Sequence, residues 1–224
     1  MAPAVQTANM DYLYKALTSG MVDVLSGGKI PKMSHNQASG LIGSWIVETG
    51  KPGLEGLDVV ERGNNNAGRG LSQYTGVRRD PYDVARADAL AAGKDVQGAE
   101  WQLKYFIDEY VGRHDRGGNS MIGWTRIFEN APKQGTPAEF ADYYTGSEAE
   151  ARGYFRPGTP HLKQRMDAAM AVSEIYQRQK AAAVELKKPQ PLPPSAGNTV
   201  TTYAPQQPVN KTLSKLNIPV LNQF

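Results

Sequence analysis

A strong helix signal at residues 34–50 constrains the fold of this chain more than any other segment. Ser34 and Gln37 have the spacing of a capping box, in which each side chain bonds a backbone N–H group at the start of a helix. The apolar residues that follow recur at helical spacing and are Ala38, Leu41, Ile42 and Trp45. Gly50 is well placed to end the helix. The segment therefore predicts a helix with one apolar face and with Glu48 in its last turn.

Helical patterns recur through residues 1–186, which predicts a mainly α fold. Further helices are expected at 11–25, 83–92, 100–110, 121–129 and 137–144. The 100–110 segment is too apolar for a surface helix, so we expect it at the centre of the fold. Residues 51–80 lack periodicity and are rich in Gly and Asn, which predicts a long loop or a short β-hairpin.

The first and last helices each have an expected apolar stripe. In the helix at 11–25 the stripe is formed by Leu13, Leu17, Met21 and Val24, and Gly27-Gly28 ends the helix. The last helix is expected to begin with Thr159 as N-cap and Pro160 as the first helical residue. It runs to about Leu186 with a stripe of Leu162, Met166, Met170, Ile175 and Tyr176.

Composition changes sharply at Lys187, which predicts two parts, a body at 1–186 and an extended tail at 187–224. The tail begins with the Pro-rich linker KKPQPLPPSAGN and cannot form a core of its own. It holds four of the 25 basic residues and none of the 22 acidic ones, which leaves the body a formal charge of −1. This charge disfavours a nucleic-acid-binding body, since phosphate binding needs clustered Lys and Arg. We expect the tail to bind a partner protein, and the alternative is that it folds back on its own body.

Several classes of protein are disfavoured. The chain has no cysteine, and His35, His114 and His161 lack the close spacing of a zinc site, so no metal is expected. No window is apolar enough for a membrane span, and the N-terminus does not have the pattern of a signal peptide. Neither a phosphate-binding loop nor a nucleophile elbow is found, and no organic cofactor is implied.

Glu48 has local surroundings suited to acid catalysis. Cleavage of a glycosidic bond requires a carboxylic acid that stays protonated near neutral pH. The partial negative charge at a helix C-terminus and burial beside Trp45, one turn earlier, both favour the protonated carboxyl. The alternative interpretation of Glu48 is a solvated glutamate at a helix end.

Two stretches of the chain resemble the phage tail-lysozyme family, namely GLIGSWIVETGKPGL and the later NNNAGRGLSQYTGVRRD. More distantly they are similar to goose-type lysozymes and lytic transglycosylases. The segments QLKYFIDEY, ADYYTG and GYFRPG resemble later parts of the same pattern, so the resemblance covers about residues 10–180. It implies a lysozyme-like helical domain with a short β-hairpin or loop region, and a peptidoglycan glycan strand as substrate.

The resemblance also implies roles for particular residues. Glu48 resembles the catalytic acid, and the cleft wall beyond the scissile bond would be formed by Gln73, Tyr74 and Thr75. Tyr74 stands where relatives have Trp and keeps a ring for stacking. Tyr143 and Tyr144 either line the cleft, because aromatic faces suit sugar rings, or pack in the core.

Two departures leave the mechanism open. Phe155 stands where many relatives carry Glu before Arg-Pro, which puts full activity in question. A second catalytic carboxylate is not assigned, although Glu55, Asp58 and Glu61 follow the Glu48 helix closely enough to approach it. The sequence therefore does not separate hydrolysis from the intramolecular attack of a lytic transglycosylase.

Three hypotheses follow. The first is a virion-associated peptidoglycan-cleaving enzyme that acts on the host cell wall and is held by residues 187–224 to a phage structural protein of the tail or internal core. The second is a structural or adaptor protein of the particle with an inactive lysozyme-like domain. The third and weakest is an ejected protein that handles DNA through its basic tail.

Overall fold

The computed structural model describes residues 4–60, 68–114, 126–146, 153–155, 159 and 161–187. By their contacts the residues separate into two units, Met1–Lys187 and Lys188–Phe224. The second unit, which contains nearly all of the predicted tail, lies outside the described residues. Much of the helix expected at 121–129 lies outside them too.

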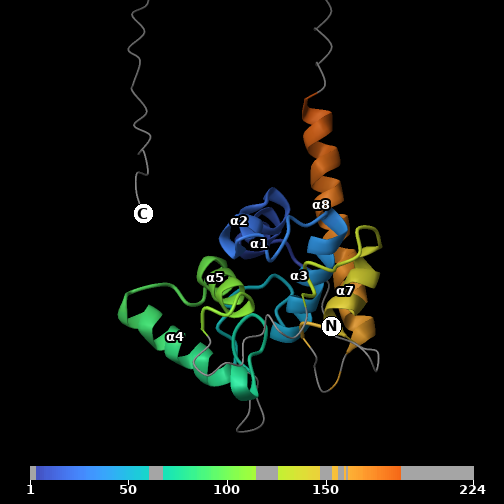
Figure 1. The fold of residues 1–224 in the computed structure, drawn as a ribbon. Helices are drawn as coiled ribbons and strands as arrows, with labels where there is room; N and C mark the ends of the chain where they lie inside the picture. Colours follow the sequence, from blue (N-terminus) through green and yellow to red (C-terminus); the bar gives the residue numbers. More distant parts are fainter. Residues whose placement is uncertain are drawn as a thin grey trace, which may run out of the picture. The chain divides into compact units, whose positions relative to one another are not determined.

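The described part of the first unit is mainly helical, as the sequence predicts (Figure 1). Its helices are α1 (Ala8–Ser19), α2 (Met21–Ser26), α3 (His35–Thr49), the 3-10 turn η1 (Gly76–Arg78), α4 (Arg79–Ala91), α5 (Ala99–Tyr110), α7 (Pro137–Thr145) and α8 (Leu162–Leu186). None of these helices is both long and apolar enough to cross a membrane. In the predicted loop or hairpin region, isolated antiparallel bridges pair Val60 with Arg69 and Arg69 with Tyr74.

Helix α3 is the core of the fold and begins as predicted. Ser34 and Gln37 form the capping box, and Gly50 ends the helix in the left-handed region with φ 65°. Buried residues occupy nearly the whole length of α3, and the helix packs against α1, α7 and α8. In Figure 1, α3, α7 and α8 lie side by side.

A glycine lets α3 and α8 approach very closely. A Cβ atom added at Gly43 would lie 2.4 Å from the backbone nitrogen of Ala169 and 2.6 Å from its Cα. These distances are too short for any side chain, so the two backbones meet at this point. The crossing determines how the C-terminal turn of α3 lies against α8.

The first predicted helix is in fact two helices. Gly20 adopts φ 97° and separates α1 from α2, so the apolar stripe does not continue across it. Leu13 and Leu17 are buried as expected, but Met21 and Val24 are exposed and Val22 is buried instead. The break changes the phase of the helix, which is why a single stripe drawn through both halves was wrong.

The last helix begins later than predicted. His161 lies in the left-handed region with φ 46°, and α8 starts at Leu162 instead of Pro160. The expected stripe is also displaced, since Met170 is exposed. The residues that α8 buries are Arg165, Ala168, Ala169, Val172, Ser173 and Tyr176. Small alanines face α3 because the close crossing leaves no room for larger side chains.

Helix α5 is central, as its apolar sequence predicts. Almost all of its residues from Gln102 onward are buried, including the charged residues Asp108 and Glu109. Phe106 packs edge-on against Trp45 of α3, with ring centroids 5.2 Å apart. Through this contact α5 supports the turn of α3 that precedes Glu48.

We expect Gly43→Ala to destabilise the fold by about 1–3 kcal/mol, the usual cost of inserting atoms into a packed core. The added methyl group forces α8 away from α3, since its nearest neighbours are backbone atoms of Ala169. Urea unfolding followed by circular dichroism measures the change. Ala87→Ser, on an exposed position of α4, is the control and should change stability little. Unchanged stability of Gly43→Ala would contradict the close crossing.

His35 should make stability depend on pH. Its two ring nitrogens lie 2.7 Å from the Tyr14 hydroxyl of α1 and 2.7 Å from the Ser173 hydroxyl of α8. Burial and then the charge of Lys180 lower the pKa of His35. The unfolded chain therefore binds a proton at a higher pH than the folded chain. The contribution of neutral His35 to the free energy of unfolding is complete above the pKa of the unfolded chain, near 6.5. It is lost as pH falls through that value towards the lower pKa of the folded chain.

Denaturant titrations at a series of pH values from 7.5 to 5 would measure this loss as a falling free energy of unfolding. His35→Gln keeps hydrogen-bonding groups near Tyr14 and Ser173 without the titration, so it should flatten the profile over the same pH range. Parallel profiles for the two proteins would contradict the assignment.

Candidate active site

Glu48 lies in the last turn of α3, as the sequence predicts, and its side chain is only 12% exposed. The structure therefore does not support the alternative of a freely solvated glutamate. Glu48 also has a partner that the sequence did not indicate. Nη2 of Arg165, on α8, donates a hydrogen bond of 2.7 Å to its Oε1 atom.

The charge of Arg165 changes the expected electrostatics of Glu48. The C-terminal end of α3 and partial burial oppose a negative charge on the carboxyl group. The guanidinium of Arg165, itself 2% exposed, favours the carboxylate. The surroundings of Glu48 thus combine opposing effects, whereas sequence reasoning recognised only those that favour the protonated acid.

Residues 69–75 are attached directly to the helix that carries Glu48. Nε1 of Trp45 donates a 3.1 Å hydrogen bond to Oγ of Ser72, and Leu71 is buried in the same core. Gly70 allows the tight return of this segment, because it has φ 76° and a Cβ there would lie 2.6 Å from the Tyr82 hydroxyl. The two motifs that carry the sequence resemblance are therefore joined in the fold.

Gln73 has two features that are typical of a binding residue. Its φ of 47° is in the left-handed region, where non-glycine residues are uncommon. Its Nε2 donates to the Gly70 carbonyl at 3.0 Å, while its buried Oε1 has no hydrogen-bond partner among the described residues. A buried acceptor without a partner is uncommon in folded proteins, and a ligand reaches this one only if the side chain turns outward.

The neighbours of Gln73 differ in exposure. Thr75 is exposed, but Tyr74 is fully buried and stacks on Tyr82 with centroids 4.9 Å apart. Tyr105 meets both rings edge-on, and burial raises the pKa of Tyr74 well above its usual value. The Tyr74 ring has no free face for a sugar, so its role as a stacking surface needs correction to a core residue behind the segment.

The two later tyrosines also differ from each other. Tyr143 is half-buried, and its hydroxyl donates to the Ile127 carbonyl at 2.9 Å. Tyr144 is fully buried in the main core, which agrees with the packing alternative for this residue. Of this pair, only Tyr143 has an exposed part that a ligand could touch.

The three candidates for a second catalytic carboxylate differ in burial and in their contacts. Asp58 is buried, where it accepts from the Tyr82 hydroxyl at 3.0 Å and from Nε of Arg86 at 2.6 Å. It thus anchors the loop to α4. Glu55 is exposed, and Glu61 lies outside the described residues. Asp58 has the contacts of a structural residue, which leaves Glu55 as the candidate on a described surface.

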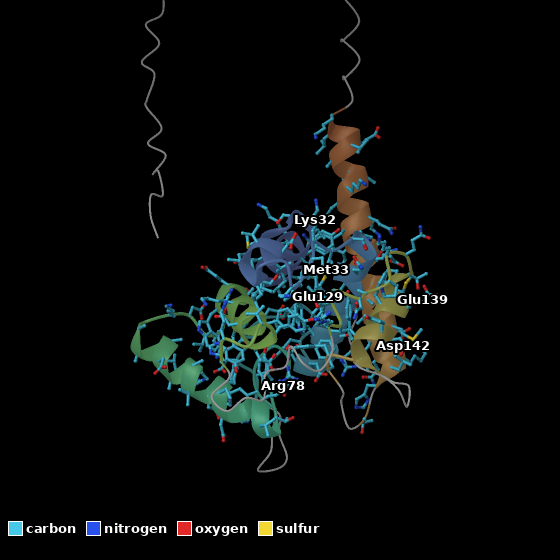
Figure 2. All side chains as sticks on the ribbon, in the orientation of Figure 1. Lys32, Met33, Arg78, Glu129, Glu139 and Asp142 are labelled. Atoms are coloured by element: carbon cyan, nitrogen blue, oxygen red, sulfur yellow. The ribbon has the colours of Figure 1, made fainter. Side chains whose placement is uncertain are left out.

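A buried ion pair supports the segment from behind. Arg78, labelled in Figure 2 beside the start of α4, donates through Nη2 to Oε2 of Glu109 at 3.1 Å and to the Tyr154 hydroxyl at 2.8 Å. The Tyr154 hydroxyl in turn donates to Glu109 at 2.9 Å. The guanidinium also lies 4.9 Å from the centre of the Tyr74 ring. These contacts fix the end of the 69–75 segment on α5.

Sequence reasoning missed Arg165 and Glu109. Arg165 occupies a position on the buried stripe of α8, and Glu109 lies within the very apolar α5. A charged residue at a core position is the signal that could have found both, since such residues are rarely buried unless they are paired.

Among the described residues, Glu48 belongs to no metal site and does not line the cavity between α4 and α5. Within the described ranges, no group of three or more His, Cys, Asp or Glu residues could hold a metal ion. A cavity of about 250 Å³ lies between α4 and α5, with Trp101, Tyr105 and His114 in its wall. None of the predicted site residues lines this cavity.

Arg78→Met should destabilise the protein by about 3–5 kcal/mol, because it leaves the Glu109 carboxylate buried without its charged partner. The double variant Arg78→Met/Glu109→Leu should lose less than the sum of the two single changes. Chemical unfolding of the four proteins measures this coupling. Strict additivity of the single changes would show that the pair is not linked as described.

No curated protein and no solved structure matches the chain. A family described as phage tail lysozyme matches residues 26–178, which include α3 with Glu48, the 69–75 segment and Arg165. The match spans more than half of the chain, and it agrees with the order of the motifs. The chain therefore belongs to the phage tail lysozyme family.

Proposed function

We propose that this lysozyme-like phage protein is a virion-associated enzyme that cleaves the glycan strand of peptidoglycan, with Glu48 as general acid. The observation that carries the proposal is the placement of Glu48 at the end of α3, which Trp45 bonds to the 69–75 segment of the same family pattern. A glycosidase acid must meet the substrate in a positioned, partly desolvated site. Glu48 has a fixed partner and little exposure, in keeping with that need.

In this mechanism the Glu48 carboxyl donates its proton to the oxygen that leaves the cleaved glycosidic bond. The resulting carboxylate then accepts a proton from the attacking group, which is water in a hydrolase or a sugar hydroxyl in a transglycosylase. Arg165 stabilises the carboxylate that this second step uses. The first step needs the protonated form, so proton uptake must compete with the ion pair.

The substrate contacts that we propose are Gln73, Thr75 and Tyr143. The Oε1 atom of Gln73 has no partner among the described residues and would accept from a sugar hydroxyl or an amide N–H group once the side chain turns outward. Thr75, two residues later, is exposed. Tyr143 is partly exposed on α7. Tyr74 and Tyr144 support these residues from the core and do not touch the glycan.

The remaining parts of the proposal concern location. The enzyme acts on the host cell wall during infection, and residues 187–224 fasten it to a phage structural protein of the tail or internal core. The composition of residues 187–224 supports binding to a partner, because the segment is Pro-rich and carries basic residues without acidic ones. No metal or organic cofactor enters this mechanism.

A second candidate is a structural protein of the particle whose lysozyme-like domain is inactive. Two observations favour it, namely the ion pair on Glu48 and the burial of Tyr74. The family resemblance adds a third reason, because Phe155 stands where it would place a glutamate. The two candidate functions differ in whether the protein cleaves peptidoglycan with Glu48 as the acid.

Glu48→Gln decides between the candidates. The amide keeps the shape of the side chain but cannot donate the proton, so release of soluble fragments from purified peptidoglycan should fall roughly 10²–10⁴-fold. The matched control is Glu174→Gln, which makes the same change at an exposed, paired residue of α8 and should keep full activity. Equal inactivity of the wild type and both variants would support the structural role.

The products of the same reaction identify the chemistry. A hydrolase releases sugars with reducing ends, whereas a transglycosylase releases an anhydro sugar that is lighter by one water molecule. Glu55→Gln, assayed in parallel, tests the exposed carboxylate as a second catalytic group. Full activity of Glu48→Gln in any of these assays would contradict the proposed acid.

A further inference from the structure

Arg165 is a charged residue in a position that the fold would fill more simply with an apolar one. It begins the buried stripe of α8, ahead of Ala168 and Ala169, and the whole residue is 1% exposed. A buried ion pair generally gives no more stability than well-packed apolar residues of similar volume. The stability of the α3–α8 packing therefore does not by itself account for an arginine at this position.

Contacts with Glu48, Ser44 and Phe155 hold the guanidinium of Arg165. Nη2 lies 2.7 Å from Oε1 of Glu48, and Nη1 lies 3.3 Å from the Ser44 carbonyl oxygen of the same helix. The ring of Phe155 covers the group, with its centroid 5.2 Å from Cζ. Because the guanidinium is planar, bonds to two points on α3 and a ring beside it leave little freedom to rotate.

The same contacts limit the freedom of Glu48. A glutamate at the end of a helix has several rotatable bonds and would otherwise sample many directions. Ser44 lies one turn before Glu48 on the same helix. Because Arg165 bonds both the Ser44 carbonyl and the Glu48 carboxyl, it fixes the position of the carboxyl relative to the α3 backbone. A misplacement of about 1 Å in a catalytic group can reduce turnover on the order of 10²-fold.

We infer that Arg165, held in place by Phe155, is a positioning residue that aims the Glu48 carboxyl at the reacting glycosidic oxygen. The inference rests on the proposed function and adds two residues to its machinery. It also gives Phe155 a role of its own. The ring at this position supports the cation that orients the acid, and it supplies no charge to the substrate.

The test uses full-length protein and soluble peptidoglycan fragments, with kcat and KM measured separately. Arg165→Met removes the charge and should lower kcat on the order of 10²-fold with little change in KM. Arg165→Lys keeps a donor but not the planar fork, so it should recover part of the lost kcat. Phe155→Leu keeps an apolar side chain without the ring face, and it should cause a smaller loss of kcat in the same direction.

Folding is controlled separately in every variant. Phe155→Leu is the variant best able to fold, because it leaves the ion pair in place, and unfolding curves give the folded fraction by which each kcat is corrected. A double-mutant cycle of Arg165→Met with Glu48→Gln, read by stability, tests the direct coupling of the two side chains. Coupling and the graded loss of kcat at constant KM are the expected results.

Two outcomes would overturn the inference in different ways. If the wild type is active and Glu48→Gln is not, but folded Arg165→Met and Phe155→Leu keep the wild-type kcat, the positioning role is wrong and the proposed function stands. A change confined to KM has the same meaning. If the wild type cleaves no fragment, the proposed function fails and the positioning role fails with it.

Discussion

The close crossing of α3 and α8 at Gly43 is the constraint on which the rest of the structure depends. Because the two backbones meet there, the turn of α3 that carries Glu48 is held beside the turn of α8 that carries Arg165. These residues are far apart in the sequence, and helix packing alone brings them together. The same crossing explains why the small residues Ala168 and Ala169 follow Arg165 on the buried face of α8.

A second set of buried polar contacts holds the 69–75 segment in place. Trp45 bonds Ser72 from α3, while Arg78 bonds Glu109 and Tyr154 behind the segment. Satisfied polar networks of this kind favour one backbone arrangement over its alternatives, because any other arrangement would leave buried groups unpaired. The strained backbone of Gln73 can persist in such surroundings.

The parts of the fold that depend on local patterns could be predicted from the sequence. The capping box and stripe of α3, the apolar α5 and the helical class are all of this kind. Gly20 and His161 could not be placed, because a left-handed residue changes the phase of a helix without a strong local signal. The start of α8 and its stripe were wrong for that reason.

The candidate site was predictable only in part. Its motif positions followed from a family pattern, but burial is a tertiary property, so the sequence could not show that Tyr74 and Tyr144 are covered while Thr75 is exposed. The partner of Glu48 was missed because an ion pair between helices that are distant in the sequence has no characteristic residue spacing. A charged residue at a core position is the signal that reasoning from sequence should follow.

A crystal structure of the Glu48→Gln protein with a bound peptidoglycan fragment would test the central claim most directly. The account predicts that a glycosidic oxygen lies within hydrogen-bond distance of the side chain at position 48, with a sugar donor group facing Oε1 of Gln73. A fragment bound elsewhere, as in the cavity between α4 and α5, would contradict it.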